Sequence, residues 1–500
     1  MTGATLRKMT VVLLSVPSAG QKNLPPGYSV STDATGMFKF ENIVPGDYKV
    51  SAWGPGYLEN SQNTSTVLHL VSGETVSKYD IKLTRQSVIT GRVLDENGDP
   101  VRDVRVMAIS QFWVHGHRQY GFASQDTTDD RGQYRLANLY PGRYYVRAMP
   151  ESGSFIEQPG QTPVSLVTVF YPEVSAVQNA TMLDVHAGDN LDGINFLLHP
   201  KPSFHIRGVV TLDDDPDVLS QYTIAAGLPG STGDLLDYEG EFSDAGYFDI
   251  AGLVPGAYDV QVRTSHGSIL ATAPAEIRSA DVNTVAIHIP SRVTVKGSLQ
   301  WADADSGNLS NSEVILTPFD KGYESSYRGL VGPHGLFSIV KVPPGKYVVS
   351  AYPLPEGAYL KSAVYGQNDV LGSIFEIPAG ASESLHMTVK TGAGRVAGTI
   401  QPPGGLGVIL IREAWVSDPG LLFLSADQNG AFTFKNVPPG KYHAFAFSDS
   451  DIGVWWNPEF VRQMDSSAVE IDLPENGALQ IQLSPIPARD VQSAIDRIPQ

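Results

Sequence analysis

The stretch GAFTFKNVPPGKYHAFA, residues 430–446, decides the fold, because four other stretches repeat its pattern without a gap. In every copy a second glycine lies ten residues after the first, a proline precedes it and a tyrosine follows two residues later. Such self-similarity marks a chain built from repeated structural units. The other copies are GMFKFENIVPGDYKVSA from Gly36, GQYRLANLYPGRYYVRA from Gly132, GYFDIAGLVPGAYDVQV from Gly246 and GLFSIVKVPPGKYVVSA from Gly335.

Each part of the pattern predicts a local structure. The first glycine follows a polar turn, where a positive φ closes a hairpin or forms a bulge. Alternating apolar and polar residues then predict a strand with one buried face, and Pro-Gly predicts a tight turn with positive φ at the glycine. We expect the tyrosine hydroxyl of the next strand to bond back to the turn backbone. The repeat residues are Gly36, Gly46, Tyr48, Gly132, Gly142, Tyr144, Gly246, Gly256, Tyr258, Gly335, Gly345, Tyr347, Gly430, Gly440 and Tyr442.

Two further strands flank each copy of the repeat. An opening strand carries a glycine, as in VITGRV around Gly91 and VAGTI around Gly398, and a closing strand follows a short polar turn, as in SGETVSKYDIKL. Short strands at a spacing of about 8–12 residues predict an all-β fold. We therefore expect a tandem array of five Ig-like or transthyretin-like β-sandwiches.

The boundaries follow from the opening and closing strands. They define module 1 (1–86), module 2 (87–201), a divergent module 3 (202–291), module 4 (292–391), module 5 (392–486) and a tail (487–500). Module 1 lacks an opening strand, so the chain begins inside a module and any signal peptide is expected to be absent from it. The apolar run Thr10–Val16 fits a strand of module 1 better than a signal peptide, and only Asp490–Arg497 is expected to be helical.

The repeat resembles the carboxypeptidase regulatory-like domain, and so does the opening of module 2, GRVLDENGDPVRDVRVMAIS (91–110). The resemblance covers nearly the whole chain and is clearest in modules 2 and 5. It implies a seven-stranded, transthyretin-like sandwich grouped with carbohydrate-binding-like folds, in proteins that are usually exported from bacteria. It implies little about function, because the domain accompanies many activities.

Composition excludes several kinds of partner. The chain holds 35 basic and 53 acidic residues, a net charge of −18, so a nucleic acid partner is not expected. No run approaches the roughly 20 apolar residues of a membrane-spanning helix, and the absence of cysteine excludes disulfides and thiolate metal sites.

No catalytic motif was found, so we expect a protein that is not an enzyme. None of the eleven histidines begins an H-x-x-E zinc pair, and no G-x-S-x-G elbow or phosphate loop occurs. An enzyme whose site is built from unfamiliar loops remains an alternative, because spaced carboxylate pairs leave no mark in a sequence.

Two groups of residues could hold a metal. His115 and His117 share a face if their segment is a strand, although histidines are also common in exposed loops. Asp303 and Asp305 belong to the carboxylate cluster closest to a calcium loop, and the alternative is that these residues only form a hairpin turn. Calcium is the one cofactor that the sequence suggests.

Aromatic residues outside the repeated strands offer the best prediction of a ligand site. Flat rings on loops can stack against sugar rings, although one tryptophan of each group could instead close the end of a sandwich. The candidates are Trp455, Trp456, Phe112, Trp113 and Tyr120.

The sequence thus favours a non-catalytic, extracytoplasmic protein that binds carbohydrate or has an adhesive, surface-presentation role. Its expected partners are glycans or other surface proteins. The first alternative is a structural spacer or accessory to a partner enzyme or outer-membrane receptor. The identity of the ligand, the geometry between modules and the oligomeric state do not follow from the sequence.

Overall fold

The structure is a computed structural model. It describes residues 4–500 except 17–25, 60–66, 78, 151–154, 157–162, 176, 214–215, 230–235, 244, 266–268, 303–306, 320–325, 404–405, 414–420, 428, 448–451 and 499–500. The chain forms two compact units. Unit 1 comprises Met1–Ser110, Phe122–Glu151 and Leu166–His199, and unit 2 comprises Gln111–Gly121, Ser152–Ser165 and Pro200–Gln500.

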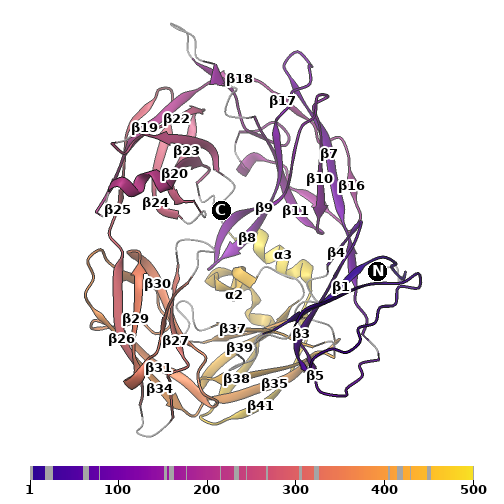
Figure 1. Ribbon diagram of the computed structural model, residues 1–500, viewed down its shortest axis with the longest axis vertical. Helices are drawn as coiled ribbons and strands as arrows, with labels where there is room; N and C mark the ends of the chain where they lie inside the picture. Colours follow the sequence, from indigo (N-terminus) through magenta and orange to yellow (C-terminus); the bar gives the residue numbers. More distant parts are fainter. Residues whose placement is uncertain are drawn as a thin grey trace. The chain divides into compact units, whose positions relative to one another are not determined.

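Strands dominate the described residues from one end of the chain to the other (Figure 1), as the repeat predicts. The strands of module 1 are β1 (Thr10–Ser15), β2 (Tyr28–Ser31), β3 (Gly46–Trp53), β4 (Tyr57–Glu59), β5 (Val67–Leu70) and β6 (Leu83–Arg85). Those of module 2 are β7 (Ser87–Asp95), β8 (Arg105–Val114), β9 (His117–Thr127), β10 (Gln133–Leu139), β11 (Gly142–Met149), β12 (Phe155–Ile156), β13 (Val164–Leu166), β14 (Val169–Phe170), β15 (Leu183–Val185), β16 (Asn190–Leu191), β17 (Phe196–Leu198) and β18 (Pro200–Pro202).

Modules 3 to 5 continue the same succession. Module 3 contains β19 (Phe204–Leu212), β20 (Tyr222–Gly227), β21 (Leu236–Phe242), β22 (Tyr247–Leu253), β23 (Gly256–Thr264), β24 (Ile269–Ile277) and β25 (Val282–Ile289). Module 4 contains β26 (Val293–Trp301), β27 (Glu313–Pro318), β28 (Tyr327–Leu330), β29 (Leu336–Val342), β30 (Gly345–Tyr352), β31 (Ala358–Tyr365), β32 (Asn368–Asp369), β33 (Phe375–Ile377) and β34 (Ser384–Thr391). Module 5 contains β35 (Gly394–Ile400), β36 (Gly407–Arg412), β37 (Leu421–Ser425), β38 (Ala431–Val437), β39 (Gly440–Phe447), β40 (Val469–Leu473), β41 (Ala478–Leu483) and β42 (Pro485–Ile486).

In modules 2, 4 and 5 the two strands of the repeat belong to different layers of the sandwich. In module 4 the first strand, β29, pairs with the opening strand β26, and β26 pairs in parallel with the closing strand β34. The second strand, β30, lies in the other sheet, ordered β28-β27-β30-β33. Modules 2 and 5 repeat this division, whereas in module 3 β21 pairs with both β20 and β22 and joins the layers into one seven-stranded path.

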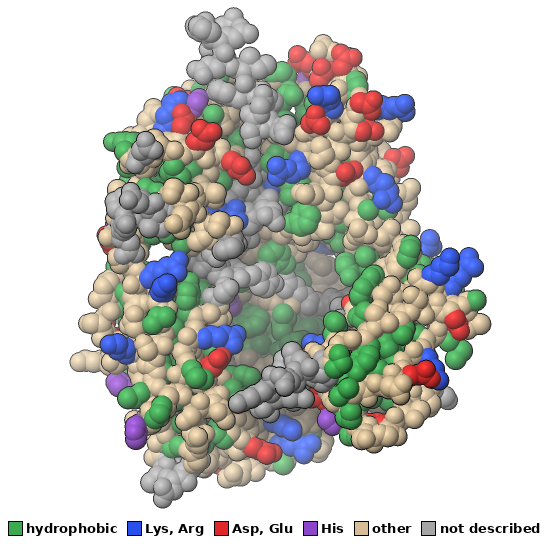
Figure 2. Space-filling view, in the orientation of Figure 1, with side chains coloured by type: hydrophobic (Ala, Val, Ile, Leu, Met, Phe, Trp, Pro, Cys, Tyr) green, Lys and Arg blue, Asp and Glu red, His purple; other side chains and the backbone are tan. Residues whose placement is uncertain are grey.

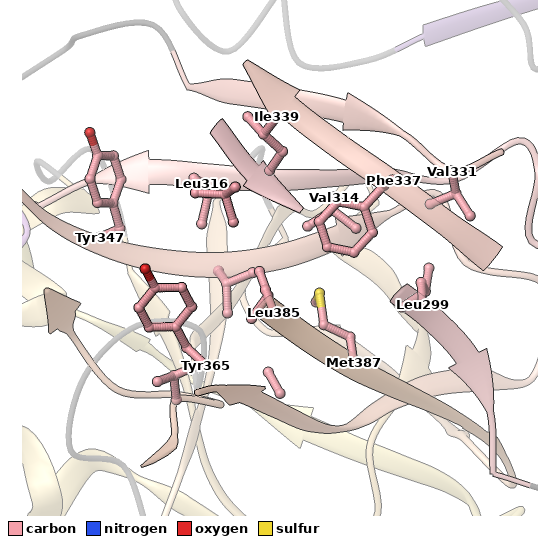
Figure 3. Close-up of a cluster of buried hydrophobic side chains, with 14 of the residues drawn as sticks. Leu299, Val314, Leu316, Val331, Phe337, Ile339, Tyr347, Tyr365, Leu385 and Met387 are labelled. Atoms are coloured by element: carbon pink, nitrogen blue, oxygen red, sulfur yellow. The ribbon is translucent and has the colours of Figure 1, made fainter. Parts of the chain in front are cut away.

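The core of each sandwich lies between these layers. Figure 3 shows it in module 4, where side chains from both sheets point toward one another. Phe337 of β29, Leu316 of β27 and Leu385 of β34 are at most 5% exposed there. The apolar residues of the predicted alternation thus face the core, and the polar residues between them face the solvent.

The tyrosine prediction is confirmed in all five copies. Each hydroxyl donates a hydrogen bond to the carbonyl oxygen four residues earlier, just before the Pro-Gly pair. The oxygen–oxygen distances lie between 2.6 and 2.9 Å, within the normal range. The bonds join Tyr48 to Val44, Tyr144 to Tyr140, Tyr258 to Val254, Tyr347 to Pro343 and Tyr442 to Pro438.

The two glycines of the repeat behave differently. The first has a φ between 67° and 80° in every copy, as predicted. The prediction for the second is wrong in three copies, because Gly46, Gly142 and Gly256 do not have positive φ. The second glycine is the first residue of the following strand in each copy, so its backbone is already part of the sheet.

The repeat has a left-handed residue that the sequence analysis missed. Four residues before the second glycine, φ lies between 55° and 82° in all five copies, and in modules 2 to 5 a register shift in the ladder accompanies it. An extra residue in one strand is a β-bulge, and asparagine and glycine tolerate this conformation best. The residues are Asn42, Asn138, Gly252, Lys341 and Asn436.

Module 1 departs from the prediction in its first repeat strand. Phe38 and Phe40 were expected on a strand, but residues 36–45 form none. The strand that would pair with this segment is the opening strand, and module 1 has no counterpart to it among its described residues. The predicted strand of Thr10–Val16 is confirmed as β1.

Among the described residues, α-helices occur only near the C-terminal end, and short 3-10 helices lie elsewhere, as at Pro216–Gln221. The expected tail helix is α3 (Ala488–Arg497), and a second, unexpected helix is α2 (Pro458–Met464). Asn457 caps α2 by accepting hydrogen bonds from two backbone amides, and Pro458 occupies the first turn, a start signal that the sequence contained. Among the described residues, no helix is long and apolar enough to cross a membrane.

Candidate functional site

The hairpin tip 111–121 brings together most of the predicted site residues. It joins β8 to β9 through His115 and Gly116, whose φ values of 46° and 78° suit a tight two-residue turn. The tip belongs to unit 2, together with the C-terminal helices.

Two of the predicted ligand-binding tryptophans lie in one hydrophobic core. Trp455 is 0% exposed and Trp113 is 4% exposed. Both belong to a cluster that includes Phe445 and Phe460, whose ring centroids lie 4.9 and 5.0 Å from that of Trp455. These contacts are typical of aromatic packing in a protein interior.

Hydrogen bonds hold the hairpin tip against residues 453–498. Gly116 donates its amide to the carbonyl of Gly453 at 3.1 Å, and its own carbonyl accepts from the Asn457 side chain at 3.0 Å. Arg118 donates to the carbonyl of Ile498 at 2.7 Å, and its guanidinium lies 5.2 Å from the centre of the Trp113 ring. The hairpin is therefore a structural contact within unit 2.

Burial contradicts sugar stacking at Trp455 and Trp113. A ring enclosed in the core offers no face to a ligand, so the predicted stacking role is wrong for these two residues. Trp455 instead packs with α2 and α3 against the face of the β36–β39 sheet that is opposite the core of module 5. Phe112, Tyr120 and Trp456 are partly exposed, and Phe112 packs against Gly121 across the hairpin.

The predicted histidine pair does not have the expected geometry. His115 lies in the turn and not on the strand face that begins at His117. Both imidazoles contact the ring of Phe319, with centroid distances of 5.2 and 5.8 Å, and phenylalanine cannot ligate a metal. No group of three or more metal-ligating side chains occurs in the part of the chain that the structure describes, and Asp303 and Asp305 lie outside it.

A groove of about 620 Å³ lies on the outer face of module 3. Its walls come from four neighbouring strands, in the order β21-β22-β19-β25. Val209 of β19 and Ala286 of β25 are paired in register, and Tyr247 of β22 is opposite Val209. The small side chains of Val209 and Ala286 leave a hollow in the surface of the sheet beside Tyr247, which is 62% exposed.

A fixed set of charges borders the groove. Arg207 donates to Asp249 and Asp281 at 2.8 Å each, and to the side chain of Asn283 at 3.3 Å. Burial acts to raise the pKa of Asp281, but hydrogen bonds from the His205 amide and Arg207 outweigh it and hold that pKa below its usual value. Asp281 is therefore ionised at neutral pH.

Sequence reasoning missed this groove. Alternation in HIRGVV (205–210) and YFDIAG (247–252) places Arg207, Tyr247 and Asp249 on the outward face. Only the register of β19 against β22, which pairs Arg207 with Asp249, brings these side chains together. A single sequence does not contain that register.

Comparisons with known proteins agree with the repeat analysis for one module. Residues 88–182 match the carboxypeptidase regulatory-like domain. No curated protein matches the sequence.

Solved structures similar to the chain include the TIE protein of Bacillus anthracis, with 11% identity, 85% of this chain and 80% of that chain covered, and a TM-score of 0.19. Another is BcpA, the major pilin subunit of Bacillus cereus, with 10% identity, coverages of 61% and 99%, and a TM-score of 0.16. The RrgB pilus protein of Streptococcus pneumoniae has 9% identity, coverages of 83% and 99%, and a TM-score of 0.16. Scores this low carry no conclusion about function. The chain is thus an array of β-sandwich modules that contains a carboxypeptidase regulatory-like domain at residues 88–182.

Proposed function

We propose that the chain is a non-catalytic, extracytoplasmic β-sandwich array with an adhesive role, and that the groove of module 3 binds an oligosaccharide. The observation that carries the proposal is Tyr247, whose ring is 62% exposed over a groove bordered by a fixed charge network. A flat ring takes the apolar face of a sugar, and the neighbouring charged groups take its hydroxyls.

The charge network supports binding rather than hydrolysis. Glycoside hydrolysis needs a carboxylic acid that keeps its proton until it protonates the leaving group. The Asp249 carboxylate is hydrogen-bonded by His205 at 2.6 Å and by Arg207 at 2.8 Å, and Asp281 has a lowered pKa. Both carboxylates can accept hydrogen bonds from hydroxyl groups, and its lowered pKa makes Asp281 a poor proton donor.

A glycan array followed by calorimetry with the full chain tests the proposal. We expect saturable binding that falls by at least about tenfold in Tyr247→Ala, or about 1.4 kcal/mol. Tyr352→Ala is the matched control, because Tyr352 is 71% exposed in module 4 and does not line the groove. Absence of any glycan ligand, or equal binding by Tyr247→Ala, contradicts the proposal.

A structural spacer is the second candidate, and the hairpin tip 111–121 favours it. Its Trp113 and Arg118 serve packing within unit 2. A spacer would bind no sugar on the array. Unit 2 of a spacer would also change its shape when the hydrogen bond between Gly116 and Gly453 is broken.

A further inference from the structure

Two rows of side chains run across the groove of module 3. The register pairs Glu241 of β21 with Asp249 of β22, and Asp249 with Arg207 of β19, so these three charges form one row. Two residues away along the strands, Tyr247 and Val209 are paired and begin an apolar row. Figure 2 shows side chains of both charges close together over β19 and β22, in the upper left. A ligand in the groove therefore meets an apolar row beside a charged row.

The charged row contains more negative than positive charge. Asp249 and Asp281 share the guanidinium of Arg207, which donates to both carboxylates at 2.8 Å. Glu241 adds a third carboxylate at the edge of the groove. The imidazole of His205, which lies 2.6 Å from Asp249, balances at most one further charge when it is protonated. The described residues that border the groove therefore keep a net negative charge.

Glu241 is the carboxylate that has no partner. The two oxygens of Asp249 are engaged, Oδ1 by His205 and Oδ2 by Arg207. The exposed carboxylate of Glu241 forms no hydrogen bond or ion pair with any residue that the structure describes. It lies directly opposite Asp249 on the neighbouring strand, an arrangement in which two like charges repel each other. A cation bound beside Glu241 would remove this repulsion.

The position of Tyr247 relative to Glu241 suits one sugar unit. The two residues are diagonal neighbours on β22 and β21, because Glu241 is paired with Asp249, two residues after Tyr247. Diagonal neighbours on antiparallel strands are about 7–8 Å apart, within reach of long and aromatic side chains. A sugar stacked on the ring of Tyr247 therefore brings a ring substituent next to the Glu241 carboxylate. A positively charged substituent also gains from the face of the tyrosine ring.

We propose that the groove of module 3 selects amino sugars, that is, an oligosaccharide that carries free, protonated amines. One amine pairs with Glu241, its sugar ring stacks on Tyr247, and the apolar row takes the next ring. The inference rests on the proposed function, since it names the class of oligosaccharide that the same groove binds. Acidic sugars are disfavoured, because the groove and the whole chain, with its net charge of −18, repel them.

A glucosamine oligomer and its fully N-acetylated counterpart are the two probes for the experiment. Acetylation removes the charge of each amine and keeps the sugar rings. Calorimetry with the full chain, in a weakly acidic buffer that keeps the amines protonated, should show at least tenfold tighter binding of the glucosamine oligomer. Equal binding of the two probes overturns this inference. The proposed oligosaccharide site still stands in that case if Tyr247→Ala weakens both.

Two chain variants assign the selection to one carboxylate. Glu241→Gln should abolish the tenfold preference and leave the N-acetylated oligomer bound as before, whereas Tyr247→Ala should weaken both probes. Glu239→Gln is the matched control, because Glu239 is exposed on the same strand and does not line the groove. A preference that survives Glu241→Gln, or one that Glu239→Gln also abolishes, would show a general attraction to the acidic chain and overturn the assignment.

Thermal unfolding separates a binding role of Glu241 from a structural one. Glu241→Gln removes a repulsion and no ion pair, so the midpoint of module 3 without ligand should stay the same or rise. The glucosamine oligomer should raise the midpoint of the native chain more than that of the variant. A lower midpoint in the variant without ligand would mean that Glu241 stabilises the sheet, and would contradict the proposal.

A competition experiment separates amino sugars from other polycations. A short oligolysine peptide carries similar charge without a sugar ring to stack on Tyr247. It should bind at least tenfold more weakly than the glucosamine oligomer. Tighter binding of the peptide, with displacement of the sugar, would assign the groove to basic peptides and overturn the proposal.

Discussion

Module 1 and module 2 share a sequence pattern and differ in one strand. Both have the tyrosine bond to the turn and the left-handed asparagine. Yet Gln133–Leu139 is a strand in module 2, whereas its counterpart in module 1 is not. The pattern of alternation is thus sufficient to turn the apolar side chains toward the core but not to form a strand, because a strand also needs a partner for its backbone.

The largest expected effect compares the same aromatic position with and without an opening strand. Phe337→Ala removes a ring that is 5% exposed and should lower the free energy of unfolding of module 4 by about 3–4 kcal/mol. Phe38→Ala removes a ring that is only partly buried and should cost module 1 less, about 1 kcal/mol. Native-state hydrogen exchange in each module measures both losses, and equal losses would mean that Phe38 is as fully buried in solution as Phe337.

The next effect concerns the glycine of the opening strand. Gly297→Val places a side chain against the Leu385 carbonyl and the Phe337 ring, and should destabilise module 4 by about 2–3 kcal/mol. Lys296→Val, on the exposed face of the same strand, should change the stability by less than about 0.5 kcal/mol. Hydrogen exchange of the β26 amides is the measurement, and similar values for the two variants would show that the sheet adapts to a side chain.

The tyrosine bond should be worth the same in a complete and an incomplete module. Tyr442→Phe and Tyr48→Phe each remove one hydrogen bond of 2.7 Å and should each cost about 1 kcal/mol at pH 7. Hydrogen exchange in modules 5 and 1 compares the two losses. A much smaller loss in module 1 would mean that its sheet β2-β1-β3-β5, which contains Tyr48, is also weakened.

The same tyrosine predicts a pH dependence. Burial raises the pKa of Tyr442 to about 12, above its usual value near 10. Since the folded state favours the neutral phenol, this contribution is fully present below pH 10 and is lost as the pH rises through 12. Unfolding of module 5 followed between pH 9 and 12 should show the loss in the native chain and a smaller loss in Tyr442→Phe.

The smallest effect is a gain. Lys341 is the only one of the five bulge residues that is neither asparagine nor glycine, and its φ is 58°. Lys341→Asn should therefore stabilise module 4 by about 0.5 kcal/mol, whereas Lys341→Ala should not, because alanine gains nothing in this conformation. The shift in thermal midpoint of module 4 measures the effect, and a gain in both variants would point to charge rather than backbone conformation.

Local features of the fold could be predicted from the sequence. The positive φ of Gly132 and the bond from Tyr144 to the turn depend on residues at most four positions apart, so the repeat contained them. The bulge at Asn138 was equally local, and the recurrence of asparagine or glycine at this position was its signal.

The candidate sites depended on distant residues, and sequence reasoning failed there. The burial of Trp455 depends on a hairpin whose bond to Asn457 spans 341 residues. The groove beside Tyr247 depends on the register of β19 against β22. The rule that aromatic residues on loops are exposed takes no account of the contact that buries Trp455 or of the strand register beside Tyr247.

The parallel pairing of the opening and closing strands has a mechanical consequence. A tensile load on the two ends of module 4 pulls β26 and β34 in opposite directions along their length, and six paired positions resist together. The same holds for β35 and β41 in module 5. Such a ladder must be sheared as a whole before the module can lengthen.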